Sequence, residues 1–344
     1  MSMSETYLFF DIESANCYGG EGHICSFGYV ICDSDFNVLE MDDIVMNPKA
    51  EFDPGLFGEN SRCRLAYTQE EFLREPDFSF HYERIKALLT EPGRKNVGFA
   101  VENDVGFIVC ACHHFRLPQI GFHAYDTHVI VDSINSAHRG LTGWLDFYGV
   151  KTDGLCAHKS SDDAKMTMLL TQKVCQQLNL RPAEFFARNF SSVRTSEQDI
   201  IRRKKRAYKN FISEKISVFY NRINASPVRR LLRGSYKLAF SQDRDYMQVY
   251  EITKDVFENG GTIINRLENG SVMVVEDEKK KIECQAHPRK SGVQYITMAE
   301  LYQRMKKPLP PFKTVDVSDF TGGFLDDSKN PEIMEKWMEK RIGT

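Results

Sequence analysis

The sequence predicts a two-domain α/β protein, and three observations lead to this prediction. The chain has 344 residues, which is more than one average domain needs. Hydrophobic residues make up 42% of it, which is enough to build ordered cores. Strand patterns at the start give way to alternating helix and strand patterns, and this alternation begins again after a strongly basic segment. We therefore expect a layered α/β domain followed by a second, smaller one.

The first domain is predicted to open with an antiparallel meander. Apolar, strand-like runs occur at residues 7–11, 23–32 and 36–45, and short turn segments separate them. Helical patterns then alternate with two short apolar strands. The predicted helices cover residues 78–89, 104–115, 127–136, 142–148 and 162–178, and the predicted strands cover residues 96–100 and 121–124.

The alternation resumes near residue 236 and predicts the second domain. Gly260 and Gly261 indicate a tight turn from a helix into the next strand. The predicted strands cover residues 236–240, 262–265, 271–275 and 293–296, and the predicted helices cover residues 246–259, 279–286 and 298–305. Prolines after residue 306 predict an extended tail with one late helix at 331–341.

Charge is distributed unevenly along the chain. The net charge is -3, yet residues 201–233, here called the basic band, carry 11 basic residues and one acidic residue. Phosphate neutralisation by Lys and Arg supplies most sequence-independent affinity for nucleic acids, so the band predicts a polyanion partner, with a solvated helix face as the alternative. Apolar residues recur near helical spacing and predict one long amphipathic helix. The candidate nucleic-acid-binding residues are Arg202, Arg203, Lys204, Lys205, Arg206 and Lys209.

Composition argues against several classes of protein. No apolar stretch is long enough to span a bilayer, and the first residues lack the basic flank and apolar core of a signal peptide. A cytoplasmic location is therefore expected. The nine cysteines include no Cys-x-x-Cys pair, which argues against a zinc ribbon or a disulfide scaffold.

Acidic residues at the end of the first predicted strand indicate a metal site. Asp11 and Glu13 are two residues apart, so a strand would place both side chains on one face. Carboxylates this close repel each other unless they are protonated or share a cation, and hard oxygen ligands suit Mg²⁺ or Mn²⁺. Three further candidates have simpler interpretations: Asp104 could complement a helix N-terminus, Asp163 could cap a helix, and His158 could be a surface histidine.

Taken in order, these residues resemble the motifs of the DEDDh exonucleases. Asp11 and Glu13 lie in Phe-Asp-Ile-Glu-Ser and match the first motif. Asp104 falls on the second motif, and His158 with Asp163 forms the His-x4-Asp of the third. The resemblance covers about half of the chain and implies a ribonuclease H-like fold, with a mixed sheet and flanking helices.

Two further segments bear on this resemblance. Asp126-Thr127 is similar to the Asp-Thr dipeptide that the family carries between its second and third motifs. Phe99-Ala100-Val101 stands where the family usually has His-Asn-Ala. This departure removes polar groups that normally help to order the site.

The resemblance implies a metal-dependent 3′–5′ exonuclease. Two Mg²⁺ or Mn²⁺ ions about 3.5–4 Å apart would clamp the attacking and leaving oxygens of the phosphodiester. Asp11 would bridge both ions, Glu13 and Asp163 would complete the first site, and Asp104 would support the second. His158, an imidazole with an unperturbed pKa of about 6.5, would act as general base toward the attacking water.

The second domain carries a resemblance of its own. The segments are Arg233-Gly-Ser-Tyr-Lys-Leu-Ala-Phe-Ser241, Gly260-Gly-Thr-Ile-Ile264 and Ser271-Val-Met-Val-Val275, followed by three lysines at 279–281. Together they resemble a BRCT domain, a module of DNA-repair and replication proteins. The resemblance implies a repair or replication partner, with Ser241 and the three lysines as candidate phosphate contacts.

These resemblances predict four regions and leave three activities open. The regions are an exonuclease domain at 1–180, a basic helical linker at 181–233, a BRCT-like domain at 234–307 and a tail at 308–344. The BRCT resemblance favours DNA as the substrate. The alternatives are an exoribonuclease or oligoribonuclease, which would recognise the ribose 2′-hydroxyl, and a catalytically weak nuclease-derived scaffold that binds nucleic acid.

Overall fold

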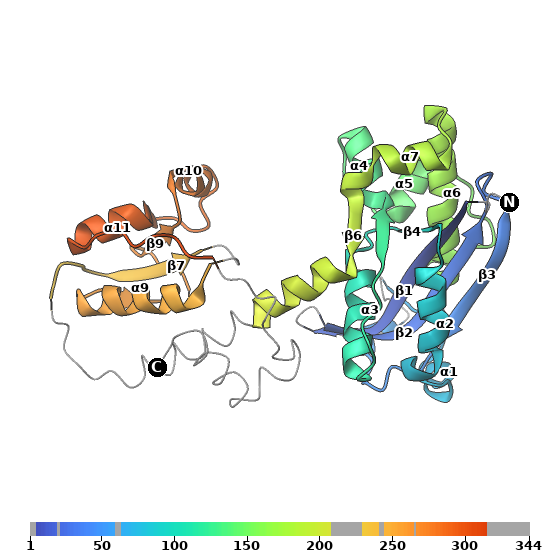
Figure 1. Cartoon of the computed structure of the whole chain (residues 1–344), viewed down its shortest axis with the longest axis horizontal. Helices are drawn as coiled ribbons and strands as arrows, with labels where there is room; N and C mark the ends of the chain where they lie inside the picture. The colour runs from blue at the N-terminus through green and yellow to red at the C-terminus, as the bar shows by residue number, and fades with distance from the viewer. Residues whose placement is uncertain are drawn as a thin grey trace. The chain divides into compact units, whose positions relative to one another are not determined.

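The computed structural model describes residues 5–18, 21–58, 63–207, 229–240, 244–264 and 266–314. The chain divides into two compact units, Met1–Ile200 and Ile201–Thr344 (Figure 1). Both units combine strands with helices, so the predicted α/β class is correct.

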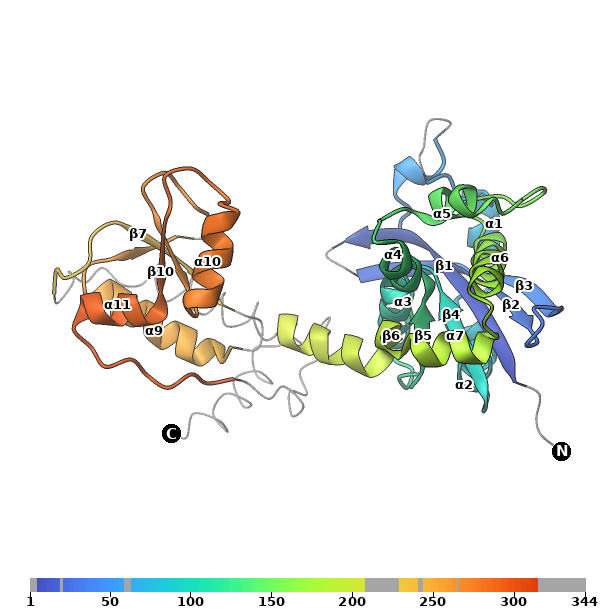
Figure 2. The same cartoon turned by 90° about the horizontal axis from the view of Figure 1, so that it is seen from above.

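A six-stranded mixed sheet forms the centre of the first unit (Figures 1 and 2). Its strands lie in the order β3-β2-β1-β4-β5-β6. The first three strands pair antiparallel, which confirms the predicted meander, whereas β4 and β5 run parallel to β1 and β6 is antiparallel to β5. The strands are β1 (Thr6–Tyr18), β2 (Glu21–Cys32), β3 (Val38–Val45), β4 (Arg94–Gly98), β5 (His123–Asp126) and β6 (Val193–Thr195).

Helices cover both faces of this sheet. Successive side chains of β1 point to opposite faces, so Leu8 and Phe10 pack with α2 and α3, whereas Tyr7 and Phe9 pack with α4 to α7. All four side chains are fully buried, as expected for a strand covered on both sides. The helices are α2 (Phe78–Thr90), α3 (Glu102–His114), α4 (Thr127–Asn135), α5 (Leu141–Tyr148), α6 (Ser160–Leu178) and α7 (Pro182–Arg188).

The second unit is built on a parallel sheet with the strand order β10-β9-β7-β8. One core packs α9 and α11 on the same face, where the Tyr302 hydroxyl donates to Asp255 at 3.0 Å, while α10 packs on the other face (Figure 2). The predicted order of strands and helices is confirmed. The elements are β7 (Ser235–Ala239), α9 (Tyr246–Glu258), β8 (Thr262–Ile263), β9 (Val272–Val275), α10 (Glu278–Ala286), β10 (Gln294–Thr297) and α11 (Met298–Met305).

The start of the predicted tail packs on this second unit. The Gln248 amide donates to the Pro311 carbonyl at 2.6 Å and accepts from the Lys313 N–H at 3.1 Å. Arg244 is almost fully buried and lies 3.2 Å from the centre of the Phe312 ring. Residues up to 314 therefore belong to the folded unit. The helix predicted at 331–341 lies outside the described residues.

Several short elements of the first unit were not predicted. These are α7, β6, the 3₁₀ helices Pro54–Leu56 and Phe190–Ser192, and α1 (Gln69–Arg74). Each has seven residues or fewer, too few for hydrophobic periodicity to separate a helix from a loop. Because β6 pairs with β5, the sheet of the first unit continues beyond residue 180, and the chain divides after Ile200.

The basic band is helical only in part. A helix runs through 196–207, residues 208–228 are not described, and residues 229–233 form neither helix nor strand. The prediction of one helix across the whole band is therefore wrong at its C-terminal end. Within the described ranges, no helix has both the length and the apolar character needed to cross a membrane.

Candidate metal centre

The centre is built on β1, the strand that lies between β2 and β4. Asp11 and Glu13 point to the same face of this strand, and their partners on β2 are Gly28 and Ser26. The pairing becomes irregular directly after Glu13. Both carboxylates are partly buried in the middle of the sheet. The sheet therefore fixes their backbone positions.

Gly28 lets the first turn of α6 approach the sheet closely. A Cβ atom at this position would lie 1.9 Å from the Ser161 nitrogen and 2.0 Å from the Ser160 carbonyl carbon. Only a residue without a side chain fits under this turn. Asp163 lies in the same turn of α6. Because Gly28 has no side chain, this turn packs close to the sheet, and the Asp163 carboxylate lies near Asp11.

Asp104 is tied directly to the strand that carries the first two carboxylates. It lies in the first turn of α3 and is 5% exposed. Its Oδ1 accepts a hydrogen bond from the backbone N–H of Ile12 at 3.1 Å, and Ile12 stands between Asp11 and Glu13. This bond holds a third carboxylate beside the first two.

His158 lies in the loop that precedes α6. Its backbone has a left-handed φ of 62°, and its N–H donates to Asp163 Oδ2 at 2.9 Å. Its Nδ1 lies 3.5 Å from Glu13 Oε1, and its carbonyl accepts from the Ala66 N–H at 3.2 Å. One potential ligand atom from each of Glu13, His158 and Asp163 lies within 4.8 Å of the others. The structure thus brings the five predicted side chains together.

Burial and repulsion by neighbouring carboxylates raise the pKa values of Asp11, Asp104 and Asp163. The pKa of Asp11 lies well above its usual value because of burial and then because of Asp104, Glu13 and Asp163. Burial also raises the pKa of Asp104 well above its usual value, against the effect of the Ile12 hydrogen bond. The pKa of Asp163 rises to about 6, mainly through burial. The largest electrostatic effects on Asp11 all come from carboxylates, a donor set that fits hard divalent cations.

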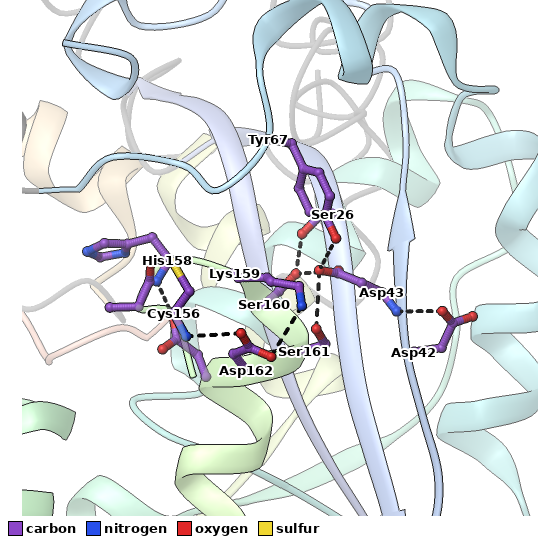
Figure 3. Close-up of polar contacts among 12 residues, drawn as sticks. Ser26, Asp42, Asp43, Tyr67, Cys156, His158, Lys159, Ser160, Ser161 and Asp162 are labelled. Atoms are coloured by element: carbon purple, nitrogen blue, oxygen red, sulfur yellow. Dashed lines mark hydrogen bonds and ion pairs between the residues drawn. The ribbon is translucent and has the colours of Figure 1, made fainter. Parts of the chain in front are cut away.

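Asp43 belongs to this centre and was not predicted. Gly28 pairs with Asp11 on one side and with Asp43 on the other, so the three residues form a row across the sheet. Figure 3 shows Asp43 accepting from the hydroxyls of Ser160 at 2.8 Å and Tyr67 at 3.0 Å. Its charge also raises the pKa of Asp11. Asp43 follows another aspartate in an exposed strand, and only the register of the meander would have singled it out.

The hydroxyls at the start of α6 complete this network. Ser161 donates to Asp43 Oδ2 at 3.4 Å, and the Ser160 hydroxyl also contacts the Ser26 hydroxyl (Figure 3). The carboxylate of Asp43 lies at a helix N-terminus, where negative charge is favourable. The network therefore anchors the turn that carries Asp163.

A pocket of about 690 Å³ opens beside His158. It is formed by the loop before α6 and the segment that leads into α1. Its walls combine apolar, aromatic and basic side chains, which are Phe57, Arg64, Leu65, Ala66, Tyr67, Thr68, Gln69, Cys156, Ala157 and His158. Apart from His158, the sequence patterns did not indicate these residues.

Asp126 orders the segment Phe99-Ala100-Val101, which precedes α3. Ala100 has a left-handed φ of 55°, and its N–H donates to Asp126 Oδ1 at 3.0 Å. The same oxygen accepts from the His128 N–H at 3.0 Å, so Asp126 also caps α4. Phe99 stacks on the His128 ring with centroids 4.6 Å apart. These contacts hold the turn that leads to Asp104.

The predicted nucleic-acid-binding residues are only partly described. Arg202, Arg203, Lys204, Lys205 and Arg206 lie on the helix at 196–207, where Arg203 is 7% exposed. Lys209 lies outside the described residues.

Comparison with known proteins finds solved structures that resemble part of the chain. No family model and no curated protein matches the chain. A 3′-exonuclease that recognises the 3′ end of a histone mRNA stem-loop is 15% identical over 51% of this chain and 65% of its own, with a TM-score of 0.43. E. coli exonuclease I in complex with a dA16 oligonucleotide is 16% identical over 54% of this chain and 43% of its own, with a TM-score of 0.43.

A third solved structure is the nuclease domain of 3′hExo, a DEDDh family member, bound to rAMP. It is 17% identical over 51% of this chain and 94% of its own, with a TM-score of 0.42. The chain spans less than two thirds of the length of the first two structures. The similarity to these solved exonuclease structures, one of them a DEDDh family member, extends over about half of the chain.

Proposed function

We propose that the first unit is a metal-dependent 3′–5′ exonuclease that hydrolyses phosphodiester bonds at the 3′ end of DNA. The observation that carries this proposal is the crowding around Asp11, where burial and four other carboxylates raise the pKa. Buried carboxylates that repel one another in this way ionise together more readily when cations lie among their oxygens. Mg²⁺ or Mn²⁺ suits such a set of hard oxygen donors.

The positions of the carboxylates support a division of roles. Asp11 interacts electrostatically with Asp104, Glu13 and Asp163, and it would be a ligand shared by the two cations. Glu13 and Asp163, whose oxygens lie close together, would complete the first site. Asp104 would support the second site from the other side of Ile12.

His158 would act as the general base in the proposed reaction. When bound, the cations would neutralise charge on the phosphate and favour ionisation of the attacking water. His158 would accept the proton of that water, because its ring lies 3.5 Å from Glu13 and is 35% exposed. The exposed edge of the ring would pass the proton on to solvent.

The pocket beside His158 would hold the terminal nucleotide. Phe57, Leu65 and Tyr67 offer apolar and aromatic surface on which a base can stack. Arg64 supplies positive charge for a phosphate. The 3′ end of a strand would then lie beside the carboxylates.

The second unit and the basic band support a DNA substrate. The parallel sheet with its three helices, together with Gly260 at a φ of 91°, fits the BRCT-like module that the sequence resembles. Such a module would bind a repair or replication partner. Arg202, Lys204, Lys205 and Arg206, which are exposed or partly exposed, would contact the substrate backbone, whereas Arg203 is buried.

A nuclease assay with three 5′-labelled substrates tests the proposal. The substrates are single-stranded DNA, duplex DNA and RNA, each incubated with Mn²⁺ and with chelator. We expect metal-dependent shortening of DNA from the 3′ end, at least about 100-fold slower with Asp11→Asn and about 10²–10⁴-fold slower with His158→Ala. Asp146→Asn and His287→Ala, which change exposed side chains elsewhere, serve as matched controls.

Each outcome of this assay decides between the proposed activities. Shortening of RNA but not DNA would make the enzyme an exoribonuclease. Binding of all three substrates without shortening would make it a scaffold. Hydrolysis that persists unchanged in Asp11→Asn would contradict the metal centre.

A further inference from the structure

A second cluster of metal-binding side chains lies on α4 and the loop that follows it. One potential ligand atom from each of His128, Asp132 and His138 lies within 4.8 Å of the others. His128 and Asp132 are four residues apart on α4, so they share one face of the helix. His138 returns to this face after the left-handed residue Ser136 ends the helix. Helix and loop together supply two imidazoles and one carboxylate.

The distances fit ligands of a single small cation. His128 Nε2 lies 3.3 Å from Asp132 Oδ2, and His138 Nδ1 lies 2.6 Å from the same oxygen. Ligand atoms about 2.0–2.1 Å from one zinc ion are about 2.9–3.4 Å apart. The His128 atom is already at this separation. The His138 side chain is 79% exposed, so it can move away from Asp132 Oδ2 by the few tenths of an ångström that a bound ion requires.

One atom of this cluster is buried without a hydrogen bond. His128 Nε2 is shielded from solvent and forms no hydrogen bond with any described residue, although Asp132 Oδ2 lies within reach. The two atoms are close but not aligned for an N–H···O bond. Such atoms are rare in folded proteins, and an ion between them would satisfy both.

The carboxylate is oriented by a contact outside the cluster. Trp144 of α5 is fully buried, and its Nε1 donates to Asp132 Oδ1 at 2.8 Å. This bond leaves Oδ2 directed at the two imidazoles. The His128 ring is fixed by stacking on Phe99. Outer contacts of this kind commonly orient the ligands of protein metal sites.

We propose that His128, Asp132 and His138 bind a transition-metal dication of the zinc class. Two imidazole nitrogens and one carboxylate favour zinc, or a neighbour such as cobalt or nickel, over Mg²⁺ or Mn²⁺. The site is separate from the carboxylate centre and shares no ligand with it. The bound ion links α4 to the loop at 136–140, and it leaves a coordination position for water.

Zinc titration of the full-length protein tests this proposal. The titration uses the Asp11→Asn variant after treatment with chelator, because this substitution weakens metal binding at the carboxylate centre. We expect one zinc ion per chain in this background, and binding at least about 10-fold weaker with His138→Ala. His138 is exposed, so its replacement is compatible with folding. His287→Ala, an exposed histidine in the second unit, should leave zinc affinity unchanged.

Two further measurements test whether the metal is bound by these three side chains. Cobalt(II) in place of zinc should give visible ligand-field bands that disappear with His138→Ala. Trp144→Phe keeps an aromatic ring but removes the donor to Asp132, and it should weaken zinc binding about 10-fold. Equal zinc stoichiometry and affinity with and without His138 would overturn the proposal, because the three side chains would then form only a hydrogen-bonded turn.

Discussion

Burial of Asp163 makes the ionised form of its side chain unfavourable in the folded protein. Its folded pKa of about 6 lies above the value of 3.8 for an unperturbed aspartate, mainly because of burial. The folded chain therefore holds a proton that the unfolded chain releases. The stabilising effect of this proton is complete below about pH 4 and is lost as the pH rises through 6. At neutral pH the ionised side chain destabilises the metal-free protein.

Replacing this carboxylate should stabilise the metal-free protein. Asp163→Asn keeps an oxygen that can accept from the His158 N–H but removes the charge. In chelator at pH 7.5 we expect its free energy of unfolding to exceed that of the wild type by about 1–3 kcal/mol. The difference should disappear near pH 4. Thermal unfolding measured from pH 4 to pH 8 checks this expectation.

The exposed Asp146 provides the control for this comparison. Asp146→Asn should unfold at the wild-type temperature at every pH. A wild type more stable than Asp163→Asn at pH 7.5 in chelator would show that the carboxylate is already neutralised by other groups.

The packing of α6 on β2 sets the geometry of the centre at the level of elements. Gly28 admits the first turn of α6, and Asp43 binds the hydroxyls of that turn. The turn carries Asp163, and His158 precedes it. A change in the separation of helix and sheet therefore moves two of the five side chains relative to Asp11.

Enlarging Gly28 should separate these elements. In Gly28→Ala the new Cβ would meet backbone atoms 1.9–2.0 Å away, which cannot move without shifting the helix. We expect a loss of about 1–3 kcal/mol in stability and a fall in nuclease activity of at least about 10-fold. Gly121→Ala is the matched control, because a Cβ there meets no atom within 4 Å. Wild-type activity in Gly28→Ala would show that the close approach is not required.

The meander and the helices α2 to α6 could be predicted from their hydrophobic patterns. The short strands β4 and β5 were also predicted, because each is a compact apolar run, whereas α1, α7 and β6 were not. Helix α1 has six residues, and its only readable signal was the capping box of Thr68 and Glu71. Strand β6 has three residues and is defined by its pairing with β5, which no local pattern encodes.

At the scale of the whole molecule, the site joins residues that are far apart in the chain. The Ile12–Asp104 bond spans 92 positions and the Asp43–Ser160 bond spans 117. The spacing of Asp11 and Glu13 on a strand indicated a metal site by itself, whereas Asp104, His158 and Asp163 were assigned to it only through a family resemblance. Asp43 and the pocket beside His158 depend on sheet register and helix packing, so they could not be read from the sequence.

The charge distribution of the whole chain bears on the proposed nuclease activity. The carboxylates of the centre repel an anionic substrate as well as one another, and bound cations reverse this local charge. In the proposed enzyme, Arg202, Lys204, Lys205 and Arg206 would attract the substrate electrostatically. Substrate binding at the centre should therefore depend on the cations that the carboxylates gather.

Anomalous diffraction from crystals grown with Mn²⁺ and a nucleoside monophosphate tests the central claim most directly. We predict two manganese peaks about 3.5–4 Å apart, with Asp11 between them, Glu13 and Asp163 beside one and Asp104 beside the other. The phosphate should lie against both ions and next to His158. Crystals that show the nucleotide bound elsewhere, and no manganese among these four carboxylates, would contradict this account.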